Sequence, residues 1–473
     1  MSEENRNNEI LPGDSLGKDD QISNASRKPA PKRSISLGTF AVSAIALVVA
    51  AVMLTYTLCG AFYKKKLADA RLDAITSGSN DGIAQIELLQ YLFDTYSYFD
   101  IDEDEIVENV LRAYVASTGD RYAQYYNKEE YEQLRENNVG SMVGIGVTVV
   151  ESDKALSRLG YNVIEIVAIS PESPAEEAGL KVGDLIAWIG IGETRESLGD
   201  LGYNGATSRL RGEAGTIAEF TVLRPLGDGF EEREFSVERR AVESVSVYSC
   251  ISETDASVGI VKISQFDLTV PKQFSTAVDD LLVRGCTKFV FDVRYNGGGD
   301  LASITAVLSY FLKDGDLLIS TEGNDGQKTD TFVGPIRYTN ADYSVCNVSK
   351  DDIGKYRDRI EKIAVICNGG TASAAELFTA AFRDYELATI VGEKTYGKGS
   401  MQTILPLSQF GYEGALKLTT KMYFPPSREG YDGIGITPDK EVSLSDAAKE
   451  YNVYLLPQSL DDQLAAAIEC FDK

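Results

Sequence analysis

The stretch CNGGTASAAELF, residues 367–378, places a serine where a strand would end and a helix would begin. The apolar run from Ile363 to Cys367 is typical of a buried strand, and Asn368-Gly369-Gly370 of a tight turn before small helix-forming residues. Ser373 in such a turn is a candidate nucleophile for a hydrolase. The chain of 473 residues contains no histidine, so a different group must take the proton from Ser373.

The composition excludes several kinds of chemistry. The 46 Lys and Arg residues against 72 Asp and Glu residues give a net charge of −26, which argues against a nucleic-acid partner. Without histidine, and with no C-x-x-C pair among the six cysteines, a zinc site or a Cys-His nucleophile has almost nothing to be built from. We therefore expect no metal and no cofactor. Cys286 and Cys367 lie in apolar runs and are expected to be plain buried residues.

The segments around Ser373 predict how it would be positioned. Strand-like SVGIVKISQF is followed by CTKFVFDVRYNGGGD, whose glycines Gly297–Gly299 precede the helix-like LASITAVLSYFL. After the Ser373 turn and its helix, a further strand is predicted in ATIVGEKTYGKG, which contains Lys398. Strands alternating with helices predict an α/β core with a mostly parallel sheet, whose active groups lie beyond the carboxyl ends of the strands. Ser373, Lys398 and the pair Gly298-Gly299 would then meet at one rim.

Two other glycine-containing patterns do not point to a site. GDSLG at residues 13–17 matches the G-x-S-x-G esterase turn, which needs a strand before it and a helix after it. The polar segment 1–36 offers neither and is predicted to be a disordered tail, so Ser15 is not a nucleophile. Neither glycine turn of the core has the G-x-x-x-x-G-K-[ST] spacing of a phosphate-binding loop, which argues against nucleotide binding.

An uncharged stretch, LGTFAVSAIALVVAAVMLTYTLCGAF, begins at Leu37 and is long enough to cross a bilayer. Residues 37–63 are therefore predicted to be a transmembrane signal anchor in contact with the lipid bilayer. Lysines and arginines flank both ends, so charge does not decide the orientation. The short tail before a large following region favours a single-pass protein of the cell membrane, with residues 67–473 outside the cytoplasm.

After the anchor, the residue pattern indicates first a helical region and then a β-rich one. Residues 67–136 carry tyrosines and leucines at helical spacing and predict a small helical lobe with a break at Gly119-Asp120. At Val143 the pattern becomes β-rich. Within SPESPAEEAGLKVGDLIAWIG we expect a short helix that starts at Ser173-Pro174 and ends at Gly179, and then a strand at Leu185–Ile189.

This β-rich stretch, residues 137–226, is similar to a PDZ domain, for which the pattern S-P-A-x-x-A-G-L-x-x-G-D is specific. PDZ domains bind a peptide C-terminus as an added strand at a sheet edge, with its carboxylate on the N–H groups of a glycine-containing loop. Here the peptide-binding loop would be Val143-Gly144-Ile145-Gly146. The alternative interpretation of the two glycines is a turn that only needs their backbone freedom.

From about residue 80 to about residue 445 the chain resembles the C-terminal processing peptidases, or tail-specific proteases, which are PDZ-containing Ser-Lys serine proteases. The matching pieces are STGDRYAQYYNKEEYEQL, the PDZ-like stretch, DVRYNGGG, NGGTASAAE, TYGKGSMQ and GIGITPDKEV, in this order. The resemblance implies an α/β protease core at 227–445, followed by a C-terminal helical segment at 446–473. It also implies protein substrates that are recognised by their free C-terminal tails.

The resemblance assigns roles to individual residues. Ser373 would be the nucleophile, Lys398, 25 residues later, the general base, and Gln402 the residue that orients the lysine. A lysine would thus take the proton that no histidine can take. Because free lysine is protonated at pH 7, burial must lower the pKa of Lys398. For the oxyanion we expect the N–H of Ala374 at the helix start, and a second N–H from Gly298 or Gly299.

Further residues are given supporting roles. Glu376, Asp292 and Arg294 are expected to be structural partners near the rim rather than catalytic groups. Relatives use an arginine in the segment that matches RLRGEAGT to link an occupied PDZ domain to the active site, and Arg211 fits this gating position; a surface charge is the alternative. Terminal helices such as LDDQLAAAIECF build dimers in relatives, which implies a homodimer.

Tyr295 and Gly297 depart from the family pattern, which commonly has Asn and Pro there. The departure affects the expected stiffness of the glycine loop and not the expected chemistry.

Two alternative functions from other classes stay open. One is a catalytically silent, membrane-tethered scaffold that binds C-terminal tails through the PDZ domain. The other is a broad exported protease whose PDZ domain does not select tails.

Overall fold

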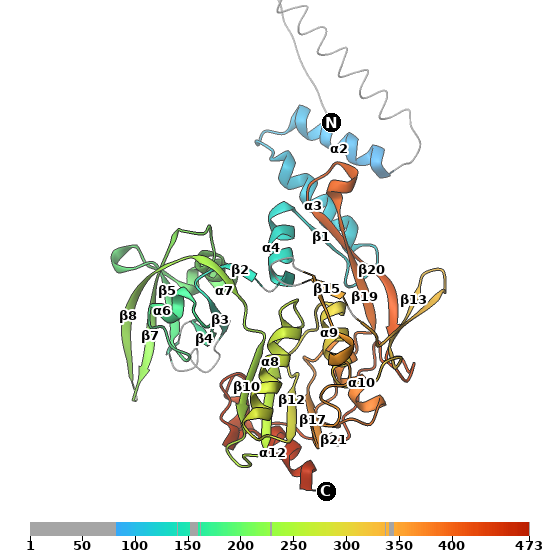
Figure 1. Cartoon of the computed structure of the whole chain (residues 1–473). Coiled ribbons are helices and arrows are strands. Elements are labelled where there is room, and N and C mark those ends of the chain that lie inside the picture. Colours follow the sequence, from blue (N-terminus) through green and yellow to red (C-terminus); the bar gives the residue numbers. More distant parts are fainter. Residues whose placement is uncertain are drawn as a thin grey trace, which may run out of the picture. The chain divides into compact units, whose positions relative to one another are not determined.

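The computed structural model describes residues 82–139, 141–151, 159–160, 162–227, 229–335, 337–339 and 345–472 (Figure 1). The predicted disordered tail, Ser15 and the predicted anchor at residues 37–63 lie outside this part. Among the described residues, no helix combines the length and apolar character needed to span a membrane. The chain divides into two units, residues 1–103 and 104–473, and the first contains helix α2 (Gly82–Tyr96).

The core sheet of the second unit carries the candidate site. In spatial order its strands are β10 (Val247–Ile251), β11 (Val258–Ile263), β12 (Lys288–Asp292), β17 (Lys362–Cys367), β18 (Thr389–Gly392) and β21 (Lys440–Glu441). β10 pairs antiparallel with β11, and all other neighbouring strands are parallel. The mostly parallel α/β core predicted from the sequence is confirmed.

Both faces of this sheet are covered, which explains why its strands are nearly continuous apolar runs. The covering helices are α8 (Val270–Val283), α9 (Leu301–Ser309), α10 (Ala374–Asp384) and α12 (Asp462–Glu469). On β12, Phe289 and Phe291 pack with α8, α9 and α10, whereas Val290 packs on the other face against Leu464 and Ala467 of α12. The apolar side of α12 is therefore buried within the chain, although the resemblance assigned this helix to a dimer interface.

A second, antiparallel sheet joins the helical lobe to the core. It consists of β1 (Gln124–Tyr126), β20 (Ala415–Phe424), β13 (Leu317–Gly323) and β14 (Lys328–Phe332) in this order, with β19 (Ser400–Pro406) also paired to β20. β1 lies between helices α3 (Glu103–Ala116) and α4 (Lys128–Val139) of the lobe. The sequence predicted only a break and a resumed helix here; β1 escaped prediction because three residues are too few to show a strand period.

The remaining elements of the core are short. They are the hairpin β15 (Arg337–Thr339) and β16 (Val345–Asn347), helix α11 (Asp446–Lys449), and the 3₁₀ turns at Lys350–Asp352, Leu407–Phe410, Gln458–Leu460 and Cys470–Asp472.

The β-rich stretch predicted at 137–226 forms a sheet of its own (green in Figure 1). Its elements are β3 (Val147–Glu151), β4 (Ile164–Ile169), α6 (Pro174–Glu177), β5 (Leu185–Ile189), a 3₁₀ turn (Gly192–Thr194), β6 (Glu196–Ser197), α7 (Leu198–Leu210), β7 (Ile217–Leu226) and β8 (Gly229–Glu238). The Ser173 cap, Pro174 and the strand Leu185–Ile189 are as predicted. The boundary at residue 226 is wrong: β7 pairs with β8 along its whole length, so the glycines after Leu226 close a hairpin rather than a domain.

A two-stranded ladder connects this module to the core. β2 (Ser141–Gly144) pairs antiparallel with β9 (Arg240–Glu243), so both chain connections of the module lie side by side. We refer to residues 141–243 as the β module.

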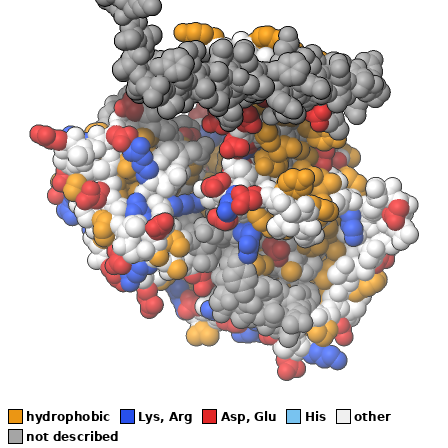
Figure 2. Space-filling model, turned by 90° about the horizontal axis from the view of Figure 1, so that it is seen from above, with side chains coloured by type: hydrophobic (Ala, Val, Ile, Leu, Met, Phe, Trp, Pro, Cys, Tyr) orange, Lys and Arg blue, Asp and Glu red, His pale blue; other side chains and the backbone are white. Residues whose placement is uncertain are grey.

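The helical lobe exposes much apolar surface. On α3 the exposed apolar side chains are Ile106, Val107, Val110, Leu111 and Tyr114. Figure 2 shows the molecule from above, where hydrophobic side chains gather in one broad area beside acidic and basic ones. Exposed apolar patches of this kind are typical of surfaces that bind another molecule.

Candidate active site

Ser373 lies where β17 gives way to α10, as the sequence predicted. It is the N-cap of α10 and has a φ of 58° and a ψ of −121°, in a region that non-glycine residues seldom adopt. The turn before it is fixed by side chains: Thr371 donates to the carbonyl of Val293 (2.8 Å), and Asn368 accepts from the N–H of Tyr295 (3.0 Å). This turn is thereby bonded to the glycine loop that follows β12.

The glycine loop lies directly against the nucleophile. A Cβ atom on Gly298, which has a φ of 102°, would be 2.7 Å from Ser373 Cβ and 2.9 Å from Ala374 N, so only glycine fits there. The N–H of Gly298 donates to Asn296 Oδ1 (2.9 Å). Within the described part of the chain, the N–H groups of Gly299 and Ala374 have no hydrogen-bond acceptor, and Ala374 directly follows Ser373.

Glu376 joins the nucleophile turn to the lysine loop. Its side chain is fully buried, and its Oε2 atom accepts both the N–H of Ser373 (3.0 Å) and the N–H of Lys398 (2.7 Å). Its Oε1 atom accepts the N–H of Gly397 (2.7 Å) and the hydroxyl of Thr395 (2.6 Å). One carboxylate therefore holds the backbones of the two predicted site residues together. The expectation that Glu376 is a structural partner at the rim fits these bonds.

The loop that carries Lys398 is not the regular strand that the sequence predicted. β18 ends at Gly392 and the next strand, β19, begins at Ser400, so residues 393–399 form a loop. Gly397 packs so closely on the facing loop that a Cβ there would be 2.7 Å from Gly435 N. Tyr423 of β20 donates its hydroxyl to the carbonyl of Lys398 (2.6 Å). The backbone groups of this loop bind side chains and several different segments, for example Tyr396 N–H to the Thr371 carbonyl (3.0 Å) and Gly433 N–H to the Gly397 carbonyl (2.8 Å), and do not form a ladder with one neighbouring strand.

The Lys398 side chain is half-buried in electropositive surroundings. Its Nζ lies 4.7 Å from the centre of the Tyr122 ring. Burial, and next the positive charges of Lys417 and Arg121, lower the pKa of Lys398, whereas the negative charge of Glu376 opposes this shift. This direction is the one a lysine base requires. In this conformation of the described chain, the side chains of Lys398 and Ser373 do not share a hydrogen bond.

Gln402 lies on β19 and is held at its nitrogen end. Nε2 donates to Ser400 Oγ and to Thr419 Oγ1, both at 3.1 Å. Its partner Thr419 belongs to β20 and in turn donates to Asp120 of the helical lobe. None of Asp120, Thr419 and Tyr122 was predicted from the sequence to be a site residue; the available signal was that Asp120 and Tyr122 stand in the family-like piece STGDRYAQYY.

The predicted peptide-binding loop occupies the start of the β module. Val143 and Gly144 belong to the β2–β9 ladder, the Ile145 carbonyl accepts from Ala175 N (2.8 Å), and a Cβ on Gly146 would lie 2.3 Å from Ser173 Cβ. Arg211 caps the end of α7, and its Cγ would be 4.0 Å from a Cβ on Gly144. The structure thus brings Arg211 beside this loop. The hydrogen bonds and ion pairs of the described residues connect neither of them to Ser373, Lys398 or Gln402.

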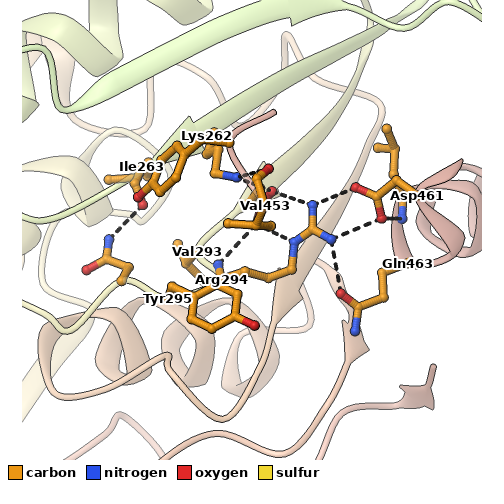
Figure 3. Close-up of polar contacts among 12 residues, drawn as sticks. Lys262, Ile263, Val293, Arg294, Tyr295, Val453, Asp461 and Gln463 are labelled. Carbon is orange, nitrogen blue, oxygen red and sulfur yellow. Dashed lines mark hydrogen bonds and ion pairs between the residues drawn. The ribbon is translucent and has the colours of Figure 1, made fainter. Parts of the chain in front are cut away.

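A buried ionic cluster lies just before the glycine loop (Figure 3). Arg294 forms ion pairs with Asp292 and Asp461, both at 2.7 Å, and donates to Gln463 Oε1 (3.0 Å). Lys262 donates to the Val453 carbonyl (2.8 Å). Burial alone would raise the pKa of Asp292, but the charges of Arg294 and Lys262 hold it at about 2. Asp292 and Arg294 are structural groups, as expected from the sequence.

These elements together resemble the machinery for nucleophilic attack on an acyl group. A strained serine at a helix start, available N–H donors beside it and a lysine of lowered pKa are what acyl transfer by serine needs.

Comparison with known proteins gives the same picture. Residues 257–442, from just before β11 to just after β21, match Peptidase family S41. The chain is 30% identical over 368 residues to a carboxy-terminal-processing protease of Bartonella bacilliformis, covering 75% of this chain and 74% of that protein. It is 28% identical over 354 residues to the carboxy-terminal processing protease CtpA of Bacillus subtilis, covering 74% of this chain and 67% of that protein.

A solved structure of an S41 protease from Bacteroides fragilis shares the fold, with a TM-score of 0.52 and 17% identity over 80% of this chain and 92% of that chain. The identity to the Bartonella relative extends over most of both proteins and is the stronger result. The chain therefore belongs to the C-terminal processing peptidases of family S41 and is a serine-type peptidase.

Proposed function

We propose that this chain is a membrane-anchored serine endopeptidase that cleaves proteins recognised by their C-terminal tails, with Ser373 and Lys398 as a catalytic dyad. The observation that supports the dyad best is that one oxygen of Glu376 binds the backbone N–H of both residues. Two loops separated in sequence are thus held at one place by a buried charge.

The proposed chemistry uses the groups at this place. Neutral Lys398 Nζ takes the proton from Ser373 Oγ as that oxygen attacks the scissile carbonyl. The developing oxyanion accepts from the N–H groups of Ala374 and Gly299, with the dipole of α10 behind Ala374. The ammonium then protonates the leaving amine, and water releases the acyl group from Ser373 with Lys398 again as base. Gln402 orients Lys398.

Tail recognition is assigned to the β module, which we propose to be a PDZ domain. β3 is at one end of its sheet, so a peptide strand can add to it, with the loop Val143–Gly146 at its start. Arg211 lies beside that loop and is proposed to signal occupancy to the active site.

The cell-level part of the proposal rests on the sequence. Residues 37–63 anchor the chain in the cell membrane, with the protease outside the cytoplasm. A homodimer is proposed to form through the helical lobe, because α3 exposes five large apolar side chains while α12 uses its own within the chain.

The test is cleavage by the full chain of a peptide with an apolar, free C-terminal tail, with the products mapped by mass spectrometry. Ser373→Ala and Lys398→Arg should both abolish cleavage without changing tail binding, since the first removes the nucleophile and the second cannot release a proton near neutrality. The controls are Ser408→Ala and Lys394→Arg, an exposed serine and an exposed lysine nearby.

Three results would contradict parts of the proposal. Cleavage by either variant above background would remove that residue from the dyad. Tail binding without cleavage by the wild type would indicate a scaffold. Cleavage that does not depend on the tail would indicate a broad-specificity protease.

A further inference from the structure

A turn of the helical lobe reaches the proposed general base. It runs from Ser117 to Ala123, between α3 and β1, and Asp120 is half-buried at its centre. Asp120 Oδ2 accepts the backbone N–H of Thr419 (2.7 Å), and Oδ1 accepts the Thr419 hydroxyl (2.9 Å). Asp120 Oδ1 also accepts the N–H of Tyr122 (3.0 Å), which fixes the turn itself.

These bonds determine which end of the Gln402 amide is free. An ionised carboxylate only accepts hydrogen bonds, so the single hydroxyl proton of Thr419 must point to Asp120. Thr419 Oγ1 then presents lone pairs to Gln402 Nε2, whose two hydrogens are used by Thr419 and Ser400. The Oε1 end of Gln402 is left as the acceptor, which is the end that a lysine Nζ can bind.

The same turn also covers Lys398. Tyr122 places its ring 4.7 Å from Lys398 Nζ, and the Arg121 guanidinium lies 4.7 Å from the Tyr122 ring and bonds its hydroxyl. Lys398 thus has the Tyr122 ring of the turn beside its Nζ, its backbone N–H is bound to Glu376 of α10, and the positive charge of Lys417 of β20 is near enough to lower its pKa. Without the turn, more water would reach Nζ.

We propose that Asp120 is a positioning residue for the general base: through Thr419 it fixes the Gln402 amide, and through its turn it holds the Tyr122 ring against Lys398. The inference rests on the proposed Ser373–Lys398 dyad and adds to it. It means that the base site is complete only when the turn of the helical lobe is bound to β20.

The experiment measures kcat, KM and their pH dependence for the full chain with the fluorogenic form of the apolar-tailed peptide. Thr419→Val removes the hydroxyl that links Asp120 to Gln402, Asp120→Asn sets an NH₂ group against one of the donors that the carboxylate accepts, and Thr419→Ser keeps the link. We expect the first two to lower kcat about 10- to 100-fold with KM nearly unchanged, a part of the roughly 100- to 10,000-fold that general-base catalysis contributes.

The pH profile separates positioning from a loss of structure. With Tyr122→Ala or Asp120→Asn, water reaches Lys398 and its pKa rises, so the acidic limb of the kcat profile should move to higher pH. Tyr122→Phe keeps the ring and should keep the limb in place. A fraction of misfolded enzyme would lower kcat at every pH without moving the limb.

The matched control is Glu413→Gln, which breaks the exposed Lys128–Glu413 pair (3.0 Å) between the same lobe and the end of the β20 hairpin. It should leave kcat, KM and the pH profile unchanged. The proposal is overturned if Asp120→Asn and Thr419→Val keep wild-type kcat and pH limb, or if Thr419→Ser is as impaired as Thr419→Val. If Lys398→Arg also remains active, the Ser373–Lys398 dyad is contradicted. If Lys398→Arg is inactive, only the role of Asp120 is contradicted.

Discussion

Two residues at the candidate site adopt backbone conformations that other surroundings would not favour. Ser373 and Tyr295, on facing loops, both have a φ of 58°. A non-glycine residue in such a region costs about 1–3 kcal/mol and persists only when its neighbours fix it. Asn368 binds the Tyr295 N–H, and Glu376 binds the Ser373 N–H. The buried carboxylate of Glu376 therefore stabilises the strained serine and its distance from the lysine loop at once.

Glu376→Gln tests this double role. The amide keeps the shape but replaces one acceptor oxygen with an NH₂ group that faces backbone N–H donors. We expect a fall in kcat of at least tenfold with little change in KM, and a loss of stability of about 1–3 kcal/mol from the unsatisfied donors. Steady-state kinetics and thermal unfolding measure the two effects. Glu441→Gln on β21, an exposed acid, is the control, and equal kinetics for the two variants would contradict the role.

The pH dependence of cleavage follows from the lowered pKa of Lys398. Neutral lysine is the active form, so activity should rise with pH and reach half its maximum below the ordinary lysine value of about 10.4. Lys417→Gln removes a neighbouring positive charge that helps to lower this pKa, so the midpoint should shift to higher pH. The measurement is kcat against pH. A midpoint that does not move, or moves to lower pH, would show that Lys417 does not act on the titrating group.

Candidate site residues that stand in a short local motif were identified from the sequence even though the motifs lie far apart in the chain, and the structure brings their backbones together. Ser373, Lys398 and the glycine loop occur in contiguous motifs with glycine turns, and each turn has a local physical cause. Asp120 and Thr419 are separated by 299 residues, and neither lies in a pattern that points to the other. Such a contact exists only once β1 pairs with β20, so it could not be predicted from local sequence patterns.

In the β module, helix α7 is bonded to the edge strand β3. Tyr203 of α7 donates its hydroxyl to the Val149 carbonyl of β3 (3.1 Å). β3 is the last strand of its sheet, and a peptide that adds to its edge needs the carbonyls on that side. Under the proposed mode of tail binding, Tyr203 occupies the Val149 carbonyl, which an added strand would use.

Tyr203→Phe should strengthen tail binding, because the tail no longer has to replace an internal hydrogen bond. A net hydrogen bond of about 0.5–1.5 kcal/mol corresponds to an affinity roughly two- to tenfold higher. The measurement is binding of an apolar-tailed peptide to the full chain that carries Ser373→Ala, so that the peptide is not cut.

An amidated form of the same peptide is the control for carboxylate recognition. It lacks the charge that the loop Val143–Gly146 is proposed to bind, so its affinity should be about ten- to a hundredfold lower with or without Tyr203→Phe. Equal binding of both peptides would mean that the β module does not read the carboxylate. Unchanged affinity in Tyr203→Phe would mean that Tyr203 does not compete with the tail.

At the level of elements, sequence patterns predicted the regular strands and helices and missed the features that depend on which strands pair. The continuous apolar strands of the core sheet and the capped helix α6 were identifiable from periodicity and capping residues. The end of the β module was misplaced because glycine-rich residues after Leu226 are equally typical of a linker and of a hairpin. Only the partner strand β8 decides between them.

The C-terminal segment completes the core as a whole. α12 covers the face of the core sheet opposite α8, α9 and α10, and Asp461 at its start caps the helix and binds Arg294 (Figure 3). Arg294 follows β12 and directly precedes the glycine loop. The last turns of the chain are thereby connected to the loop that lies against Ser373.

Asp461→Asn tests whether the ion pair between Asp461 and Arg294 stabilises the core more than an exposed ion pair does. It leaves the buried Arg294 with one carboxylate instead of two, and breaking a buried ion pair costs about 3–5 kcal/mol. We expect a clear fall in the thermal unfolding midpoint and faster proteolysis of the segment after residue 446. Glu469→Gln on the same helix breaks only the exposed pair with Lys440 (3.0 Å) and should cost less than about 1 kcal/mol.

Acid should reveal the same cluster in the wild type. The folded pKa of Asp292 is about 2, below its ordinary value of 3.8, so its contribution to stability is complete above pH 4 and is lost as the pH falls toward 2. In Asp461→Asn, Arg294 has Asp292 as its only carboxylate partner, so that contribution still disappears over the same window but from a lower starting stability. Acid unfolding of Asp461→Asn should therefore begin at a higher pH than that of the wild type and of Glu469→Gln. If all three proteins unfold at the same pH, the C-terminal segment does not stabilise the core through Arg294.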